Sequence, residues 1–332
     1  NQCSLVCPHA AIRPYLLDES EVKSAPEGFV TKKAVGKGLE KYEFRVQVSP
    51  LDCYSCGSCI KTCPVQALSF APLESQTKEA ANWDYAQTVS IKDTGLDKFS
   101  VKGSQFKLPY LEFSGACAGC GETPYAKLIT QLFGDRMYIA NATGCSSIWG
   151  NSSPSTPYTM NAKGQGPAWD NSLFEDNAEF GYGMLLAQNA IRDGLKAKVE
   201  SVMANENATD DIKAACKEWL DTYGIGALNG SATDRLVAAL SGVDCPVCKD
   251  IVANKDFLAK KSQWIFGGDG WAYDIGFGGV DHVLASGKDI NIMVYDTEVY
   301  SNTGGQASKA TKTGAVAQFA AGGKETKKKD LA

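Results

Sequence analysis

Cysteine is the residue most able to do chemistry in this 332-residue sequence, which holds 12 cysteines, most of them in short clusters. The densest cluster has the spacing C-x2-C-x2-C-x3-C-P and comprises Cys53, Cys56, Cys59 and Cys63. This spacing is typical of proteins that hold cubane clusters of four irons and four sulfides. Three thiolates two residues apart let one loop reach three corners of a cube, whereas the fourth lies too far along the chain and predicts a second cluster.

An incomplete copy of the same pattern, C-x3-C-P, opens the sequence with Cys3 and Cys7. We expect Cys7 to join Cys53, Cys56 and Cys59 around one cluster, and Cys3 to join Cys63 around the other, completed by two cysteines upstream. The sequence is therefore expected to be a fragment that starts inside the first motif. The alternative, cysteines that are free or bound to zinc, fits this spacing poorly. His9 is expected to be a surface residue or a neighbour of the ligands, not a ligand.

The elements around these motifs predict an α+β, two-cluster ferredoxin-like domain over residues 1–95. Each C-P pair leads into a helical turn and then an apolar strand, which in the second copy is residues 67–70. Residues 42–48 alternate at period two and predict a strand within an insert between the copies. Residues 76–110 carry no recognisable chemistry, and the polar turn at 92–95 suggests a linker to the next domain.

Composition restricts the function further. The net charge of −5 argues against nucleic acid as the main partner. No apolar run approaches the roughly 20 residues that a membrane helix needs. Clustered cysteines without a disulfide-like pattern, beside only 2 histidines, predict a reducing, cytoplasmic setting and sensitivity to oxygen.

A second chemistry begins in the glycine-rich loop at 115–122, where Cys117 and Cys120 form a C-x2-C pair. Cys145 follows the predicted strand 137–140. Three cysteines are one short of the four ligands of a cubane or a zinc site, so a cluster, zinc and buried thiols all remain open from the residues alone. Cys245 and Cys248 form another C-x2-C pair and are read as core or redox thiols, although a zinc site shared with Cys117 and Cys120 is a rival interpretation.

The middle of the sequence predicts helices. A 3.6-residue period over 180–195 predicts a helix that buries a face made of Phe180, Met184, Leu185, Ala187, Ile191 and Leu195. Residues 199–262 read as further helices, with Cys216 and Trp219 on a buried side.

The last informative block is a βαβ unit with parallel strands. The apolar strand at 263–266 runs into Gly268, Asp269 and Gly270, a helix is predicted over 272–286, and a buried strand over 290–295 runs into the polar loop 296–302. Ligands of such sheets lie at the carboxyl ends of the strands, where carboxylate, hydroxyl and carbonyl oxygens suit Mg²⁺ and glycine amides suit a diphosphate. The glycines at 276–279 are not a dinucleotide fingerprint, because they are expected inside the helix.

Together these blocks resemble one family, the pyruvate:ferredoxin (flavodoxin) oxidoreductases among the 2-oxoacid:ferredoxin oxidoreductases. The matching stretches are the split cysteine motifs and residues 115–122, 143–150, 164–181, 268–270 and 296–302. The resemblance implies that residues 96–332 form an α/β domain with a mainly parallel sheet that binds thiamine diphosphate and Mg²⁺.

The resemblance also implies roles for individual residues. Cys117, Cys120 and Cys145 would hold a third, proximal cluster, with a fourth cysteine beyond this chain. Mg²⁺ would be held by Asp269, Thr297 and the carbonyl of Val299. Gly268, Gly270 and Asn302 would contact the diphosphate or the reactive ring, Glu122 would contact thiamine, and Asn302 and Cys145 would stand at the catalytic centre. The Asp296-Thr297 pair departs from the asparagine pair of the general thiamine-diphosphate pattern, so the role of Thr297 depends on the closer family.

The implied reaction is the oxidative decarboxylation of pyruvate with coenzyme A to acetyl-CoA and CO₂, in anaerobic metabolism. Electrons would pass through three clusters to ferredoxin or flavodoxin, in a homodimer that binds neither nucleic acid nor membrane. The fragment alone is expected to be inactive, because the family's substrate pocket lies in missing N-terminal domains. A sister enzyme for 2-oxoglutarate or indolepyruvate and a non-enzymatic polyferredoxin are the alternatives.

Overall fold

The computed structural model describes residues 1–152 and 155–331. The chain forms two compact units, each assembled from segments that are distant in the sequence. Unit 1 comprises Asn1–Asp135, Thr143–Pro167 and Tyr295–Lys328, and unit 2 comprises Arg136–Ala142, Ala168–Val294 and Lys329–Ala332.

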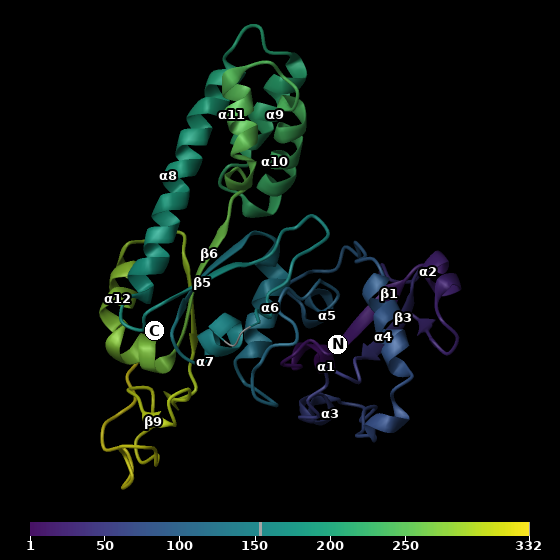
Figure 1. The fold of residues 1–332 in the computed structure, drawn as a ribbon, viewed down its shortest axis with the longest axis vertical. Helices are drawn as coiled ribbons and strands as arrows, with labels where there is room; N and C mark the ends of the chain where they lie inside the picture. The colour runs from purple at the N-terminus through teal and green to yellow at the C-terminus, as the bar shows by residue number, and fades with distance from the viewer. Residues whose placement is uncertain (153–154, 332) are drawn as a thin grey trace. The chain divides into compact units, whose positions relative to one another are not determined.

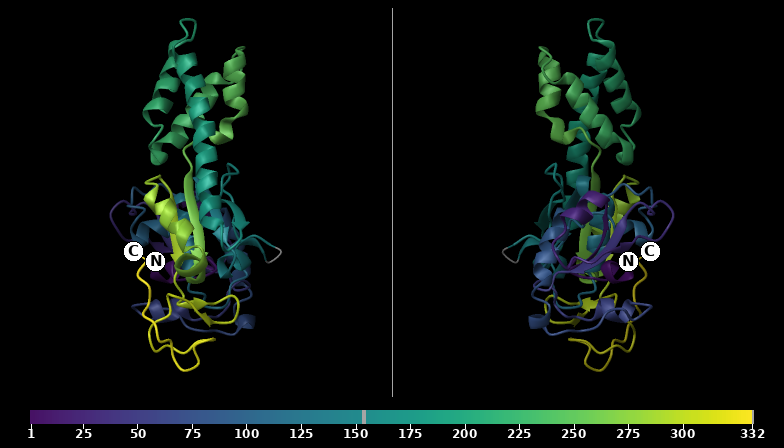
Figure 2. Two further views of the ribbon diagram at one scale, coloured as in Figure 1. Left: turned by 90° about the vertical axis from the view of Figure 1, so that its left-hand side faces the viewer. Right: turned by 90° about the vertical axis from the view of Figure 1, so that its right-hand side faces the viewer.

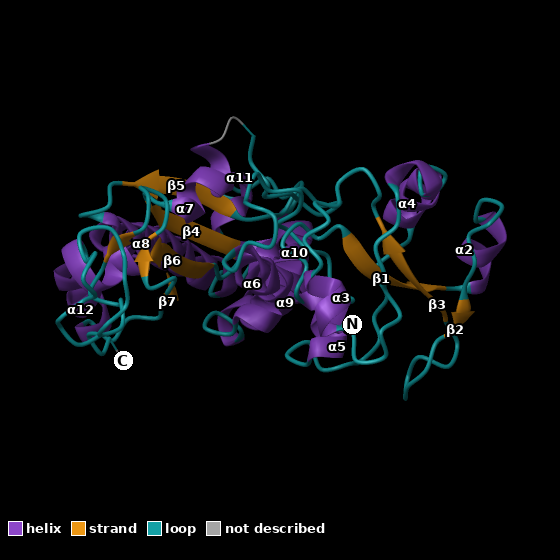
Figure 3. Cartoon of the chain, turned by 90° about the horizontal axis from the view of Figure 1, so that it is seen from below, coloured by secondary structure: helices purple, strands orange, loops and turns teal. Residues whose placement is uncertain are grey.

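Unit 1 contains a small antiparallel sheet in the order β1-β3-β2 (Figure 3). Strand β1 (Ile12–Leu17) pairs with β3 (Glu43–Val48) along its whole length, and β2 (Lys32–Lys33) pairs with the other edge of β3. The register puts Ile12 opposite Val48. The strand predicted at 42–48 from its alternation is therefore confirmed.

Helix α4 (Glu79–Thr88) belongs to the core of this unit and is not a linker. Its Ala86 is fully buried against Leu17 and Phe29. Helix α5 (Val101–Ser104) and the buried Phe106 belong to unit 1 as well. The prediction of a linker within 76–110 is wrong, because apolar side chains spaced along this segment are buried against the sheet.

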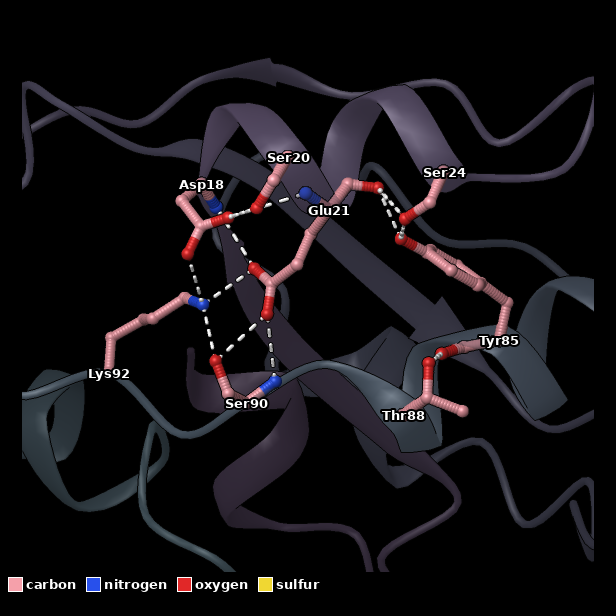
Figure 4. A network of polar contacts seen from close by, with 8 residues as sticks. All are labelled: Asp18, Ser20, Glu21, Ser24, Tyr85, Thr88, Ser90 and Lys92. Carbon is pink, nitrogen blue, oxygen red and sulfur yellow. Dashed lines mark hydrogen bonds and ion pairs between the residues drawn. The ribbon is translucent and has the colours of Figure 1, made fainter.

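The polar turn near Lys92 is anchored by charge (Figure 4). The ammonium of Lys92 forms ion pairs with Asp18 and Glu21, and only 8% of its side chain is exposed. Asp18 caps α2 (Glu19–Ser24) in a capping box with Glu21. Hydrogen bonds from Ser20 and then Lys92 lower the pKa of Asp18 to about 2.

The remaining elements of unit 1 are short, and the cysteine motifs lie on or beside them. They are α1 (Gln2–Leu5), α3 (Ser58–Thr62), a 3₁₀ turn (Leu73–Ser75), α6 (Thr123–Phe133) with a following 3₁₀ turn (Gly134–Arg136) that ends at the first residue of unit 2, α7 (Cys145–Ser147), a π-helical turn (Ile148–Ser152), β8 (Val299–Tyr300) and β9 (Gln306–Ala307). The strand predicted at 67–70 is not formed, and Phe70 is 66% exposed. Strand β1 pairs with the insert strand β3 on one side, and residues 67–70 do not pair with its other edge.

Unit 2 is built on a four-stranded sheet in the order β5-β4-β6-β7 (Figure 3). Strand β4 (Met137–Ala142) pairs in parallel with β5 (Ala168–Ser172) and with β6 (Ser262–Gly268). Strand β7 (Asn291–Tyr295) lies at the edge and is mostly half-buried, so the prediction that it is buried was wrong. The mainly parallel sheet and the positions of β4, β6 and β7 agree with the prediction.

Helix α8 (Asn177–Met203) packs on β4 and β6, as predicted for a core helix. Gly181 permits close contact, since a Cβ there would lie 2.5 Å from Ile265. The predicted face is partly wrong, because Ala187 and Ile191 are exposed. The buried face instead includes Gln188 and Arg192, whose polar groups find buried partners.

A group of helices extends from the C-terminal half of α8 (Figures 1 and 2). It consists of α9 (Asp210–Asp221), α10 (Gly226–Leu240) and α11 (Pro246–Ala253), followed by a 3₁₀ turn (Lys255–Phe257). Cys216, Trp219 and Cys248 are buried in its core, as predicted for the first two. Over residues 1–152 and 155–331, none of the helices is both long and apolar enough to span a membrane.

A π-helical turn (Gly270–Ile275) and α12 (Phe277–Ala285) connect β6 to β7. Gly276 is the N-cap residue of α12, so the glycines at 276–279 lie at the start of this helix. The prediction that they lie inside it was wrong, because the π-helical turn ends before them.

Candidate functional site

Four cysteines of unit 1 line one cavity of about 390 Å³, and they are the four predicted to hold a single cluster: Cys7, Cys53, Cys56 and Cys59. Burial raises the pKa of the Cys59 thiol, and the negative charges of Cys7, Cys53 and Cys56 raise it further. Pro8, Ile60 and Phe70 are among the other residues that line the cavity. The thiols and the space between them suit an iron–sulfur cluster.

The loop that carries three of these thiols owes its shape to two residues with positive φ. Ser55 has φ 53° and Gly57 has φ 77°, a conformation that costs glycine little. Gly57 caps α3, which carries Cys59. A Cβ at Gly57 would lie 3.1 Å from the ring of Phe70, so this loop and the 67–70 segment fit closely.

Cys3 and Cys63 lie on α1 and at the end of α3, two helices that pack against each other. Burial raises the pKa of Cys3, and the charge of Cys63 adds to the rise. The amide of Ala67 donates to Cys63 Sγ over 3.3 Å and lowers the pKa of that thiol. The structure thus brings together the two cysteines predicted to share a second cluster.

Lys127 of α6 forms hydrogen bonds to the backbone of the first cysteine motif. Its ammonium donates to the carbonyl oxygen of Ser4, and to that of Cys7 over 2.9 Å. The side chain is 1% exposed, and burial lowers the pKa of Lys127 to about 8. A positive charge therefore lies beside the backbone of both first-motif thiols.

His9 is buried, at 2% exposure, so of the two expected positions it takes that of a neighbour of the cysteines and not that of a surface residue. Its ring lies 3.9 Å from the ring of Tyr54, and its Nδ1 lies 3.4 Å from the Ser114 hydroxyl. Both His9 and Tyr54 line the cavity described above. The ring contact ties the first cysteine motif to the second.

A third group of thiols forms around Glu122. Cys117 and Cys120 lie in one turn closed by a hydrogen bond from the Cys120 amide to the Cys117 carbonyl. Burial, and then the charges of Glu122, Cys120 and Cys117, raise the pKa of Cys145 to about 12. Glu122 is buried and accepts a hydrogen bond of 2.8 Å from Trp149. The three cysteines predicted to act together are therefore neighbours.

Gly119 brings the turn of Cys117 and Cys120 close to the loop that carries Cys53, Cys56 and Cys59. It lies between Cys117 and Cys120 with φ 75°, and a Cβ on it would lie 3.5 Å from Cys56 Cβ. The turn therefore rests on the Cys53–Cys59 loop. A hydrogen bond of 3.4 Å from the Tyr54 hydroxyl to the Ser114 carbonyl joins the same two loops.

Within residues 1–152 and 155–331, no three or more His, Cys, Asp or Glu side chains converge closely enough to hold a single metal ion. A cubane binds each thiolate through a different iron, so its ligands stand apart around a volume. The spread of the thiols is consistent with cubane ligation.

The predicted Mg²⁺ and diphosphate residues belong to both units. In unit 2, Asp269 follows β6 directly and is 1% exposed, and the buried Gly270 begins the π-helical turn. In unit 1, the Thr297 hydroxyl lies 3.2 Å from the Val299 carbonyl. Asn302 is exposed. Their joint site, and the contribution of Gly268, stay predictions.

Sequence reasoning missed three residues that position the thiols. Lys127 looked like an ordinary helix residue. The only feature of the sequence that could indicate its burial is its place among the apolar residues of a short helix. Trp149 lies within a matched stretch but was given no role. Tyr54 occupies a variable position of the cysteine motif, so spacing gives no indication of its contact with His9.

Comparison with known proteins first gives a class for part of the chain. Residues 1–67 match the family described as "4Fe-4S dicluster domain". This match covers the two cysteine motifs and the insert between them, and it confirms the prediction of a two-cluster iron–sulfur domain.

Whole-chain relatives are more specific. The chain is 58% identical to "Pyruvate:ferredoxin oxidoreductase" of Moorella thermoacetica and 56% identical to "Pyruvate-flavodoxin oxidoreductase" of Enterobacter agglomerans; each match covers 100% of this chain and 29% of the relative. It is 53% identical to "Pyruvate dehydrogenase [NADP(+)], mitochondrial" of Euglena gracilis, covering 18% of that protein. The chain thus spans less than a third of these relatives, and the resemblance inferred from its motifs is confirmed.

Proposed function

We propose that this chain is the cluster-bearing portion of a pyruvate:ferredoxin or pyruvate:flavodoxin oxidoreductase, with the predicted cofactor loops in the same portion. The whole enzyme would convert pyruvate and coenzyme A to acetyl-CoA and CO₂ and pass the electrons to ferredoxin or flavodoxin. Identity above 50% along the entire chain supports the family, and the arrangement of thiols in unit 1 supports the role of this portion.

The observation that carries the proposal is the contact of Gly119 with Cys56. It arranges three groups of thiols in sequence: Cys117, Cys120 and Cys145 first, then Cys7 with Cys53, Cys56 and Cys59, and finally Cys3 with Cys63. In the last two groups, Cys3 lies on α1 and Cys7 just after it, while Cys59 lies on α3 and Cys63 at its end. A row of this kind is what electron transfer over several steps requires, whereas isolated structural metals need no such order.

The residues suit the groups that the family employs. Bound clusters supply one-electron redox chemistry, and thiamine diphosphate with Mg²⁺ supplies an electron sink for decarboxylation. Asp269 is a buried carboxylate directly after a strand of a mainly parallel sheet, which suits a hard cation. Thr297 and Val299 would supply further oxygens, and Asn302 and Glu122 would contact the cofactor.

The chain itself would position the redox groups and shield them from water. Glu122 is fixed by Trp149, whose ring packs edge-on against Tyr295 with centroids 6.1 Å apart. Trp149 is 3% and Tyr295 3% exposed, so this side of the Cys145 group is covered by aromatic rings. Exclusion of water would protect reactive intermediates.

The terminal electron acceptor would be ferredoxin or flavodoxin. Relatives carry ferredoxin, flavodoxin or NADP⁺ in their names. A sister enzyme for another 2-oxoacid is the second candidate for the substrate. Assembly as a homodimer and a reducing, cytoplasmic setting complete the proposal.

The test uses the intact parent enzyme, purified without oxygen. Pyruvate with coenzyme A should bleach the iron–sulfur absorbance and produce a reduced-cluster EPR signal. Cys120→Ser should abolish bleaching by pyruvate while dithionite still reduces the other clusters, and Cys216→Ser, a buried cysteine of unit 2, should behave as wild type. Bleaching by dithionite alone in the wild type would overturn the pyruvate assignment and leave a sister enzyme or an electron carrier.

A further inference from the structure

A pair of cysteines in unit 2 lies outside every group of thiols described so far. Cys245 is the N-cap residue of α11, with an extended backbone at φ −138° and ψ 125°, and Cys248 is the third residue of that helix. The backbone amide of Cys248 donates to Cys245 Sγ over 3.4 Å. The Cys245 sulfur therefore lies against the first turn of α11, next to the backbone of Cys248.

The two thiols differ in exposure and in acidity. Cys245 is half-buried, whereas Cys248 is 3% exposed. The hydrogen bonds from the Cys248 thiol and amide lower the pKa of Cys245, while burial raises the pKa of Cys248 to about 11. One thiol is thus accessible and inclined to ionise, and its neighbour is a shielded proton donor. This asymmetry is typical of Cys-X-X-Cys pairs that exchange disulfides.

The helical core holds the pair in place. Cys248 is packed among Cys216, Ile251 and other apolar residues, and Lys198 of α8 forms an ion pair with Asp250 of α11. Pro246 occupies the first position of the helix, where a backbone N–H would have no partner within the helix, so proline costs no hydrogen bond there. The sulfurs are therefore preorganised, and a bond between them requires little movement of the backbone.

Other roles fit the pair less well. Cysteines that serve packing alone are usually buried, and Cys245 is not. A structural zinc ion takes four ligands, and no convergent set of metal-binding side chains occurs in the described part of unit 2.

We propose that Cys245 and Cys248 form a redox-active dithiol that is oxidised to an intrachain disulfide by disulfides of low-molecular-weight thiols. The Cys245 thiolate attacks one sulfur of the small disulfide, whose S–S bond breaks and whose other sulfur leaves as a thiolate with the electron pair. Cys248 then loses its proton and attacks Cys245 Sγ, releasing the second small thiolate. One disulfide is reduced to two thiols, and two cysteines are oxidised to one disulfide.

The chain offers a direct measurement. Trypsin would release residues 236–249 as a single peptide, because Arg235 precedes it, Lys249 ends it, and it contains no other Lys or Arg. Cys245 and Cys248 are its only cysteines. The intact parent enzyme is equilibrated without oxygen in glutathione buffers from fully reduced to fully oxidised, quenched with acid, alkylated with iodoacetamide and digested.

We expect the reduced buffer to give a doubly alkylated peptide, and the oxidised buffer an unalkylated peptide lighter than the dithiol form by two hydrogen masses. Cys248→Ser should trap glutathione on Cys245, and Cys216→Ala, which alters the same core but keeps the pair, should form the disulfide as the wild type does. Doubly alkylated peptide in fully oxidised glutathione, or a glutathione adduct that persists in the wild type, would overturn the proposal. Iron content measured in the same samples separates this result from any loss of the clusters.

Discussion

Replacement of Lys127 by Met should lower the reduction potential of the nearest cluster in the intact enzyme. The ammonium is 2.9 Å from the Cys7 carbonyl oxygen. Covalent geometry separates that oxygen from the Cys7 sulfur by about 4–5 Å, so the charge lies roughly 5–8 Å from a ligand sulfur. Reduction adds a negative charge to the cluster, which a neighbouring cation stabilises.

Coulomb's law gives the size of this effect. At roughly 8 Å and an effective dielectric constant of about 20, two unit charges interact by about 2 kcal/mol. For a one-electron couple, about 1.4 kcal/mol corresponds to about 59 mV. The Lys127→Met variant should therefore show a potential more negative by roughly 90 mV.

EPR-monitored redox titration measures the shift, on protein whose iron content matches the wild type. Lys98→Met is the matched control, because Lys98 also donates to a backbone carbonyl of α6, that of Leu132. It should leave the potential unchanged. A Lys127→Met enzyme with full iron content and an unaltered potential would refute the electrostatic reasoning and leave Lys127 with a purely positional role.

Three further predictions concern stability and are measured by urea unfolding. Gly119→Ala should cost about 1–2 kcal/mol because φ is positive there, whereas Gly121→Ala, which has open space and no positive φ, should cost less; equal costs would contradict the argument from backbone conformation. Arg192→Leu should cost on the order of 3 kcal/mol, because the Leu258 and Tyr223 carbonyls lose this donor and Asn229 Oδ1 keeps only the Lys260 amide, and a change under about 0.5 kcal/mol would refute this. Asp18 has a pKa lowered to about 2, so its stabilising effect is complete above pH 3.8 and is lost as the pH falls towards 2. Asp18→Asn keeps a capping side chain and should flatten that loss; an unchanged pH profile would exclude Asp18 as its source.

The cysteine spacing predicted more of the site than of the fold. It grouped Cys7 with Cys59 and Cys3 with Cys63, because a cubane restricts which thiols can meet. Strands β3, β4 and β6 were found because alternation and short apolar runs reflect burial directly. The strand at 67–70 was predicted from an apolar run alone, and such a run does not record whether the segment pairs with a neighbouring strand; here it does not.

Other features depend on tertiary partners that no local pattern records. Arg192 is buried on α8 because its guanidinium donates hydrogen bonds to the Leu258 and Tyr223 carbonyls and to the Asn229 side chain. A hydrophobic period therefore placed the buried face of that helix incorrectly. Lys127 is a further case, since its acceptors lie more than 100 residues earlier in the sequence.

The composition of unit 1 from three separate segments has a consequence for synthesis of the protein. The cysteines of the first two motifs emerge from the ribosome well before the last segment of their unit, Tyr295–Lys328, which follows nearly the whole of unit 2. Contacts so distant in sequence form slowly, because loop closure must precede them. During that interval the motif thiols lack part of their final surroundings. Cluster insertion and protection from oxidation therefore depend on when these segments are translated as well as on the finished fold.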